Sequence, residues 1–218
     1  MPLYTTDALI LRTYKLGESD RIVVFLTRDR GKKRGVAKNA RQSRRRFGGA
    51  LEPMTCGRVA YFERERRDLV NLNYVEPIRS PFAAAEGEAL GYAGYFAELI
   101  DEWAPEANPN ETLFRLGASM VEAMAVGIPV EPLARYFEFW LLRLEGVYEA
   151  DAQLSPGAKA FLASARTSTP FALSDVAVSH GTLRELEQAH RALIARHLEK
   201  ELRSVRVIRD MRAVIRST

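Results

Sequence analysis

RIVVFLTRDRGK, residues 21–32, decides the fold of this 218-residue chain. Its first seven residues are mostly β-branched or aromatic, too few for a typical helix and too apolar for a strand with a solvated face. We therefore predict a buried strand over 21–27. Asp29, Arg30 and Gly31 then supply a hairpin turn, because glycine readily adopts positive φ. Residues 33–37 are expected to pair back as the next strand.

Three further segments with strand composition flank this hairpin: 7–14, 52–64 and 69–74. Turn residues 17–20 precede the hairpin, and the charged residues 65–68 separate the last two segments. Five short antiparallel strands in succession are typical of a partly open Greek-key barrel of the OB type. Barrels of this type commonly bind single-stranded nucleic acid through a cationic groove and aromatic stacking surfaces.

A run of positive charge lies between the third and fourth predicted strands, and no acid interrupts it from Lys32 to Arg46. Like charges in one block repel each other and stay solvated until a polyanion neutralises them. We predict nucleic-acid contacts at Lys32, Lys33, Arg34, Lys38, Arg41, Arg44, Arg45, Arg46 and Phe47. Phe47 is the preferred stacking side chain, and Tyr14, Tyr61 and Phe62 are the other aromatic residues near the charge.

The pattern becomes helical after residues 77–81, where two prolines predict the end of strand pairing. Asn108 as a cap with Pro109 at the first helical position predicts a helix that Gly127 terminates. Apolar residues at helical spacing predict the other helices, over 82–103, 132–144, about 183–198 and 201–216. The expected fold class is α+β, with an OB-type nucleic-acid-binding domain over 1–80 and an all-helical domain over 81–218.

Charge divides between the two halves. Residues 1–80 hold 18 basic and 9 acidic residues, whereas residues 81–218 hold 14 basic and 19 acidic residues. This asymmetry points to an anionic partner for the first half. On the last predicted helix, arginines recur at spacings of three and four, and they form either a solvated face or a second anion-binding strip: Arg206, Arg209, Arg212 and Arg216.

Motifs for catalysis or metal binding are missing from the sequence. It contains no phosphate-binding glycine loop and no nucleophile elbow, so we expect neither enzymatic activity nor a cofactor. His190 and His197 share an apolar helix face without an evident third ligand, which favours core histidines over a metal site. Cys56 is the only cysteine, and inside a strand it is expected to act as a small hydrophobe.

The compartment follows from similar observations. A single cysteine allows no intrachain disulfide and suits a reducing environment. The first residues lack the pattern of a signal peptide, and no apolar stretch is long enough to cross a membrane. We therefore expect a cytoplasmic, nucleoid-associated protein.

The order of these segments resembles the bacterial recombination mediator family RecO. The most specific stretch joins residues 36–41 to residues 44–53, and the other matching stretches are 9–14, 17–20, 26–27, Gly31, 67–69, 135–142, 197–198 and 202–204. The resemblance implies binding to single- and double-stranded DNA, annealing of complementary strands, and help in loading RecA onto DNA covered by single-strand-binding protein. It also implies contacts with RecR and with the acidic C-terminal tail of the single-strand-binding protein.

One departure from the family concerns zinc. Many members carry four cysteines after the central helix, but residues 146–173 contain none. Four thiolates would be needed for such a structural site, so no metal is expected and the segment is predicted to be a loop with a short helix.

Binding of an acidic, apolar peptide requires an apolar groove rimmed by cations. Candidate rim residues in the helical half are Arg115, Arg135, Arg143 and Arg203. Two other functions remain open on the sequence: an OB-type RNA-binding or translation-associated module with a helical docking domain, and a metal-dependent DNA-processing enzyme.

Overall fold

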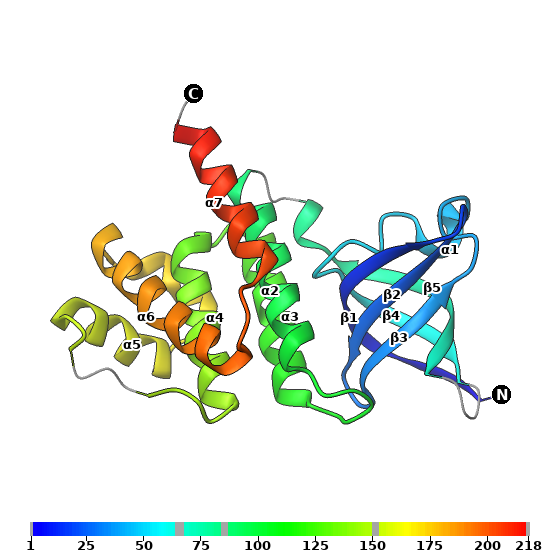
Figure 1. The fold of residues 1–218 in the computed structure, drawn as a ribbon, viewed down its shortest axis with the longest axis horizontal. Helices are drawn as coiled ribbons and strands as arrows, with labels where there is room; N and C mark the ends of the chain where they lie inside the picture. The colour runs from blue at the N-terminus through cyan, green and yellow to red at the C-terminus, as the bar shows by residue number, and fades with distance from the viewer. Residues whose placement is uncertain (1, 64–67, 84–86, 150–152, 217–218) are drawn as a thin grey trace.

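The computed structural model describes residues 2–63, 68–83, 87–149 and 153–216. Figure 1 shows a β-barrel beside a group of helices, with the C-terminal helix projecting beyond the helical part. The barrel consists of β1 (Leu3–Leu16), β2 (Asp20–Thr27), β3 (Gly31–Ala37), β4 (Cys56–Phe62) and β5 (Leu69–Arg79). A single helical turn, α1 (Arg44–Phe47), lies between β3 and β4.

The strands follow the order β1-β2-β3-β5-β4, which confirms the predicted five-stranded OB-type barrel, although the barrel is closed rather than partly open. The pairing of β3 with β5 is parallel, so the expectation of an entirely antiparallel barrel was wrong. Two strand boundaries were also wrong. β4 begins at Cys56 rather than residue 52, and β5 continues through Pro77. Proline is tolerated there because this part of β5 pairs only with β4, leaving its other edge without a ladder.

The helical part follows a 3₁₀ turn at Pro81–Ala83. Its helices are α2 (Glu88–Trp103), α3 (Glu111–Ala125), α4 (Val130–Leu144), α5 (Pro156–Thr167), α6 (His180–Leu198) and α7 (Arg203–Arg216), with a 3₁₀ segment at Pro170–Asp175. Helix α2 starts later than predicted. The cap of α3 is Asn110 rather than Asn108, since the Asn110 side chain accepts a hydrogen bond from the Leu113 amide. Residues 146–173 contain α5, a longer helix than expected.

Barrel and helices share one apolar core. Side chains from the outer surface of the barrel, including Leu9, Leu11, Val24 and Leu26, are buried in the same cluster as residues of α2, α3 and α4. Burial of apolar surface is the main stabilising contribution to a fold, so this cluster fixes the barrel on the helices. A second cluster, with Ile10, Phe25 and Tyr61, fills the interior of the barrel.

A close backbone contact adds to this junction. Gly31 has φ +69°, and a Cβ atom there would lie 2.4 Å from the Asn108 carbonyl oxygen. The Lys32 amide donates to Pro105, and the Ala107 amide donates to the Lys32 carbonyl. The β2–β3 turn is therefore joined to the α2–α3 connection by backbone hydrogen bonds that only glycine at 31 permits.

Candidate nucleic-acid interface

The basic segment after β3 closes one end of the barrel. Phe47 and Ala50 are buried in the interior cluster of the barrel, with Phe47 only 3% exposed. This corrects the prediction that Phe47 stacks on a base, because its ring already packs on protein on all sides. The ring instead anchors α1. Arg44 and Arg45 are exposed beside it, and the Arg46 guanidinium lies over the ring.

Hydrogen bonds order the residues that lead into α1. The Asn39 amide donates to the Asp20 carboxylate at 2.8 Å, and the Arg41 amide donates to the Ser19 carbonyl at 3.2 Å. The Arg41 guanidinium also donates to the Glu18 carbonyl. The segment is thus fastened to the β1–β2 turn, so its charges occupy defined positions rather than a free loop.

The exposed cations of this segment are not neutralised. Within the described residues, the side chains of Lys38, Arg44 and Arg45 form no ion pair. Arg46 donates to the Ser43 hydroxyl and to the Lys38 carbonyl, which orients its guanidinium without cancelling its charge. Arg41 is likewise held by a carbonyl oxygen rather than a carboxylate.

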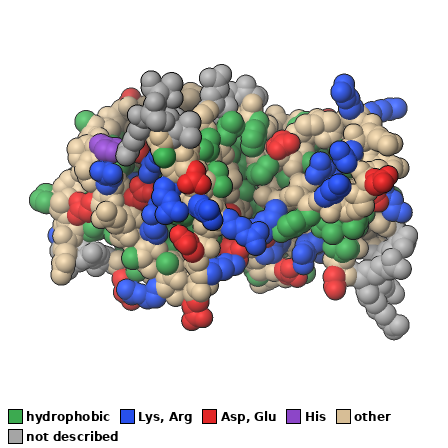
Figure 2. Space-filling view, turned by 45° about the horizontal axis from the view of Figure 1, so that its top comes forward, with side chains coloured by type: hydrophobic (Ala, Val, Ile, Leu, Met, Phe, Trp, Pro, Cys, Tyr) green, Lys and Arg blue, Asp and Glu red, His purple; other side chains and the backbone are tan. Residues whose placement is uncertain are grey.

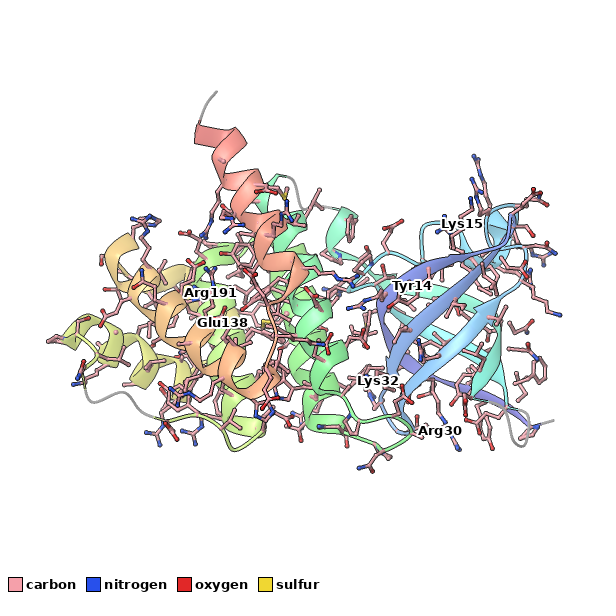
Figure 3. All side chains as sticks on the ribbon, in the orientation of Figure 1. Tyr14, Lys15, Arg30, Lys32, Glu138 and Arg191 are labelled. Carbon is pink, nitrogen blue, oxygen red and sulfur yellow. The ribbon has the colours of Figure 1, made fainter. Side chains whose placement is uncertain are left out.

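Two cations outside the sequence run join the same surface. In the strand register, Lys15 of β1 lies opposite Arg21 of β2, and Arg21 lies opposite Ala37 of β3, the residue before Lys38. Figure 3 shows Lys15 at the α1 end of the barrel, with Arg30 and Lys32 at the opposite end. The cations at the α1 end of the barrel are called the α1-end surface below: Lys15, Arg21, Lys38, Arg41, Arg44, Arg45 and Arg46. Strand register, rather than charge clustering, was the signal that could have identified Lys15 and Arg21.

The start of the basic run belongs to other parts of the structure. Lys32 forms an ion pair with Asp101 of α2 at 3.3 Å and also donates to the Asp101 carbonyl. Lys33 forms an ion pair with Glu63 at 2.6 Å. Both side chains are largely covered, so their assignment to DNA binding is corrected: they stabilise the protein itself. Arg34 is exposed and forms no ion pair within the described residues.

A partly exposed strip on the outer face of the barrel adjoins the α1-end surface. Tyr14, Ile22 and Val36 lie opposite one another on β1, β2 and β3, so their side chains share that face. Tyr14 is 37% exposed, and its hydroxyl accepts a hydrogen bond from Arg12. Tyr61 is buried and Phe62 is half-buried. Among the four aromatic residues considered, Tyr14 is therefore the one best placed to meet a base.

The predicted rim arginines of the helical part separate into two kinds. Arg135 is buried, with an ion pair of 2.6 Å to Glu138, so its assignment as a rim residue is corrected. Arg115, Arg143 and Arg203 are exposed. Arg115 lines a groove of about 490 Å³ with Phe114, Tyr136, Trp140 and Leu144, and Glu122 lines it as well. The Arg143 guanidinium lies over the Trp140 ring, but neither Arg143 nor Arg203 is among the residues that line the groove.

The histidines have structural partners. His190 is buried and shares a hydrogen bond of 3.0 Å with Glu138, which confirms the expectation of a core histidine. His197 is more exposed than expected and stacks on Trp103. No group of three potential metal ligands occurs among the residues described. Among the described helices, none has the length and apolar character to span a membrane.

Figure 2 shows Lys and Arg side chains gathered in a band over one face, running from the helical part toward the barrel with acidic residues between them. The barrel carries the cations of the α1-end surface at one end and an exposed tyrosine, Tyr14, on the adjoining face. Cations and an aromatic ring are the elements that recognition of a nucleic-acid single strand requires.

Comparisons with known proteins agree with this arrangement. Two sequence profiles match, "Recombination protein O N terminal" over residues 1–81 and "Recombination protein O C terminal" over residues 84–150. A DNA repair protein RecO from Koribacter versatilis is 43% identical over 145 residues, which is 66% of this chain and 59% of that protein. A second DNA repair protein RecO, from Geobacter metallireducens, is 39% identical over 142 residues, which is 65% of this chain and 57% of that protein.

The chain spans a little more than half the length of these curated relatives. The matched region nevertheless includes the whole barrel and continues into the helical part. On both profiles and on the identity to its relatives, the chain belongs to the RecO family of DNA repair proteins.

Proposed function

We propose that this protein binds single- and double-stranded DNA as a recombination mediator in DNA repair, without catalysing a reaction. The α1-end surface is the observation that carries this proposal, because it presents cations held in position and without acidic partners among the described residues. Phosphate contacts of this kind release counterions and bind DNA with little sequence preference.

Annealing of complementary strands fits the same surface. The cations of the α1-end surface lower the repulsion between two phosphate backbones. Unpaired bases can contact Tyr14 before they pair with the complementary strand. By family resemblance, we propose that the protein helps load RecA onto DNA covered by single-strand-binding protein, and that RecR is a partner.

The variant R44A/R45A tests the DNA site. Each phosphate contact to single-stranded DNA contributes about 0.7 to the slope of log K against log salt. We therefore expect the slope to fall by about 1.4, measured by fluorescence anisotropy of a labelled oligonucleotide over a salt series. Arg46 is left in place because it supports the segment through Ser43 and Lys38.

The matched control is R28A/R30A, which removes the same charge at the other end of the barrel. The side chains of Arg28 and Arg30 are 51% and 41% exposed, and each already pairs with a carboxylate, Asp7 at 3.4 Å and Asp29 at 3.8 Å. The control should therefore leave the slope for DNA unchanged. An unchanged slope for R44A/R45A would show that the α1-end surface does not hold phosphates. A clear preference for structured RNA over single-stranded DNA, together with no strand annealing, would favour the RNA-binding alternative instead.

The groove beside Trp140 is the proposed site for the acidic tail of the single-strand-binding protein. Its aromatic lining offers apolar contacts, and Arg28 and Arg115 supply positive charge. Arg143 adds a third cation beside Trp140. A labelled peptide that is acidic and ends in an apolar residue should bind the protein and lose affinity in R115A/R143A. The variant R203A is the control, and equal losses in both variants would contradict this location.

A further inference from the structure

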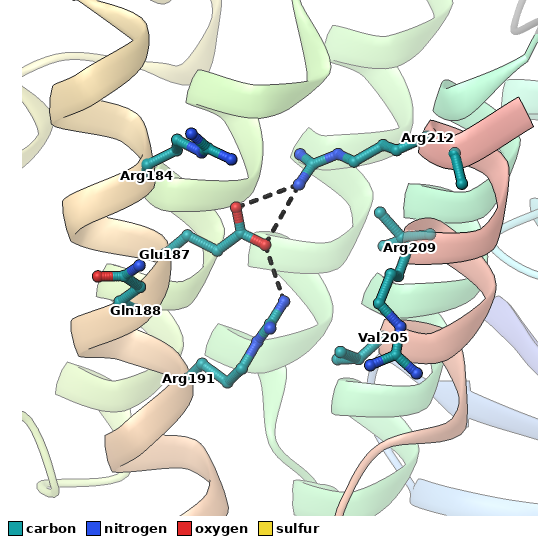
Figure 4. Close-up of a pocket in the computed structure, with 9 residues that line it drawn as sticks. Arg184, Glu187, Gln188, Arg191, Val205, Arg209 and Arg212 are labelled. Carbon is teal, nitrogen blue, oxygen red and sulfur yellow. Dashed lines mark hydrogen bonds and ion pairs between the residues drawn. The ribbon is translucent and has the colours of Figure 1, made fainter. Parts of the chain in front are cut away.

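A cleft of about 350 Å³ lies between α6 and α7, away from the α1-end surface. Figure 4 shows Arg184 and Arg191 on α6 facing Arg209 and Arg212 on α7. Val205 and Ile208, both nearly buried, also line the cleft. Four arginines and one acid, Glu187, are thus brought together by two consecutive helices.

The acids near the cleft are engaged by arginines. Glu187 forms ion pairs with Arg191 at 2.8 Å, with Arg212 at 3.2 Å and with Arg135 at 3.5 Å. Arg212 also pairs with Glu131 at 2.8 Å and contacts Glu88. Because these carboxylates are already neutralised by guanidinium groups, they do not present free negative charge to an incoming anion.

Two arginines of the cleft remain available. Arg184 and Arg209 are exposed and form no ion pair with any residue that the structure describes. Arg206, three residues from Arg209, is exposed on the same helix. Arg184 and Arg191 lie seven residues apart, which separates them by about 10 Å along α6. One guanidinium group can donate two hydrogen bonds to the oxygens of one phosphate, and it keeps its positive charge at any physiological pH.

We propose that the α6–α7 cleft is a second binding site for the phosphate backbone of a nucleic acid. The inference rests on the proposed function and extends it, because the helical half would then hold DNA despite its excess of acids. A mediator that pairs two strands needs contacts for both, and the α1-end surface and this cleft are two separate sets of cations. Arg212 and Arg191 shape the cleft through Glu187, whereas Arg184 and Arg209 contact the phosphates.

The test uses the full chain with R184A/R209A, and R166A/R196A as the control of equal charge. All four side chains are exposed, so both variants should melt at the temperature of the unsubstituted protein. Salt-dependent anisotropy with a labelled single-stranded oligonucleotide should show a slope lower by about 1.4 for R184A/R209A. The control should keep its slope, and combining R184A/R209A with R44A/R45A should lower it further.

The outcomes separate this inference from the proposed function. If R44A/R45A lowers the slope and R184A/R209A does not, the cleft holds no phosphate and the proposed function stands. If the unsubstituted protein binds no DNA, the proposed function fails and the inference fails with it. If R184A/R209A weakens an acidic peptide but leaves the slope for DNA unchanged, the cleft is a protein-docking site and the inference is overturned.

Discussion

Cys56 shows how its surroundings determine the chemistry of one side chain. It lies in β4 opposite Leu9 of β1, against the core shared by barrel and helices. Burial, and after it the charge of Asp7, raises the pKa of the Cys56 thiol from 9.0 to about 11. Only the thiolate reacts with iodoacetamide. Because the pKa is raised by about two units, the thiolate fraction at pH 8 is about 100-fold smaller in the folded protein than in urea, and we expect alkylation to be slower by that factor.

Mass spectrometry of the alkylated fraction over time measures both rates. The variant C56S provides the blank, since the chain has no other cysteine. Equal rates in the folded and unfolded protein would contradict the raised pKa and would mean that the thiol is open to solvent.

The site residues were only partly predictable from the sequence, for a physical reason. A run of cations shows where charge lies along the chain, but not which charges find acids after folding. The partner of Lys32 is Asp101, in a helix of the other half, and the partners of Arg135 include Glu187, contributed by α6. Long-range pairing of this kind leaves no local signal, whereas the exposure of Arg44 and Arg45 follows from their place in a polar segment.

At the scale of elements, α7 depends on a carboxylate from another helix. Glu98 of α2 accepts hydrogen bonds from the amides of Arg203 and Ser204, at 3.1 and 2.8 Å. These amides are at the start of α7, where a helix has no internal acceptors and favours negative charge. Burial would raise the pKa of Glu98, but the hydrogen bonds from Ser204 and Arg203 outweigh it and lower the pKa below its usual value.

We expect E98Q to lower the free energy of unfolding by about 1 kcal/mol at pH 7, as loss of a charged cap usually does. A carboxylate with a lowered folded pKa stabilises the protein above its unfolded pKa, near 4.5, and that stability is lost as pH falls through the folded value. The difference between E98Q and the unsubstituted protein should therefore shrink toward zero in acid.

Urea unfolding at pH 7 and in mild acid measures this difference. The control is E149Q, because the Glu149 side chain is 78% exposed and its ion pair with Arg196 is long. A destabilisation of E98Q that stays constant with pH would point to altered contacts of the side chain rather than to the charge of the cap.

Elements were predicted more reliably than their ends. The spacing of apolar residues, together with the turn residues, predicted all five strands and the main helices. Strands and helices depend on the local alternation of apolar and polar residues. The ends depend on neighbours in space. β5 continues through Pro77 because its edge is free there, and α3 is capped by Asn110, whose side chain reaches the Leu113 amide. The closure of β3 on β5 joins residues from opposite sides of the basic segment, which no local pattern reveals.

At the scale of the whole molecule, the division of charge and the division of the core do not coincide. The basic excess belongs to residues 1–80, yet Leu9 and Leu26 of the barrel lie in one apolar cluster with α2, α3 and α4. Ion pairs of Arg12 and Lys32 with Asp101 cross the same junction. Isolated residues 1–80 would expose this apolar face, so DNA binding is better tested in the full chain.

Gly117 of α3 provides a direct test of that shared core. A Cβ atom there would lie 2.6 Å from the Leu9 side chain and 2.8 Å from that of Ile100, so a larger residue has to displace two fully buried side chains. We expect G117V to lower the free energy of unfolding by about 1–3 kcal/mol, as overpacking does. The matched control is G94V in α2, where a Cβ atom meets nothing within 4 Å and the change should stay within about 0.5 kcal/mol.

The two tryptophans, Trp103 and Trp140, lie in the helical part, so their fluorescence follows that half while far-ultraviolet circular dichroism follows the whole chain. One core predicts that both signals change together in urea, for the unsubstituted protein and for G117V alike. If G117V separated the two transitions, the barrel would retain its fold without the helices. The Leu9 contact would then join two independent units, and the two sets of cations could move relative to each other on DNA.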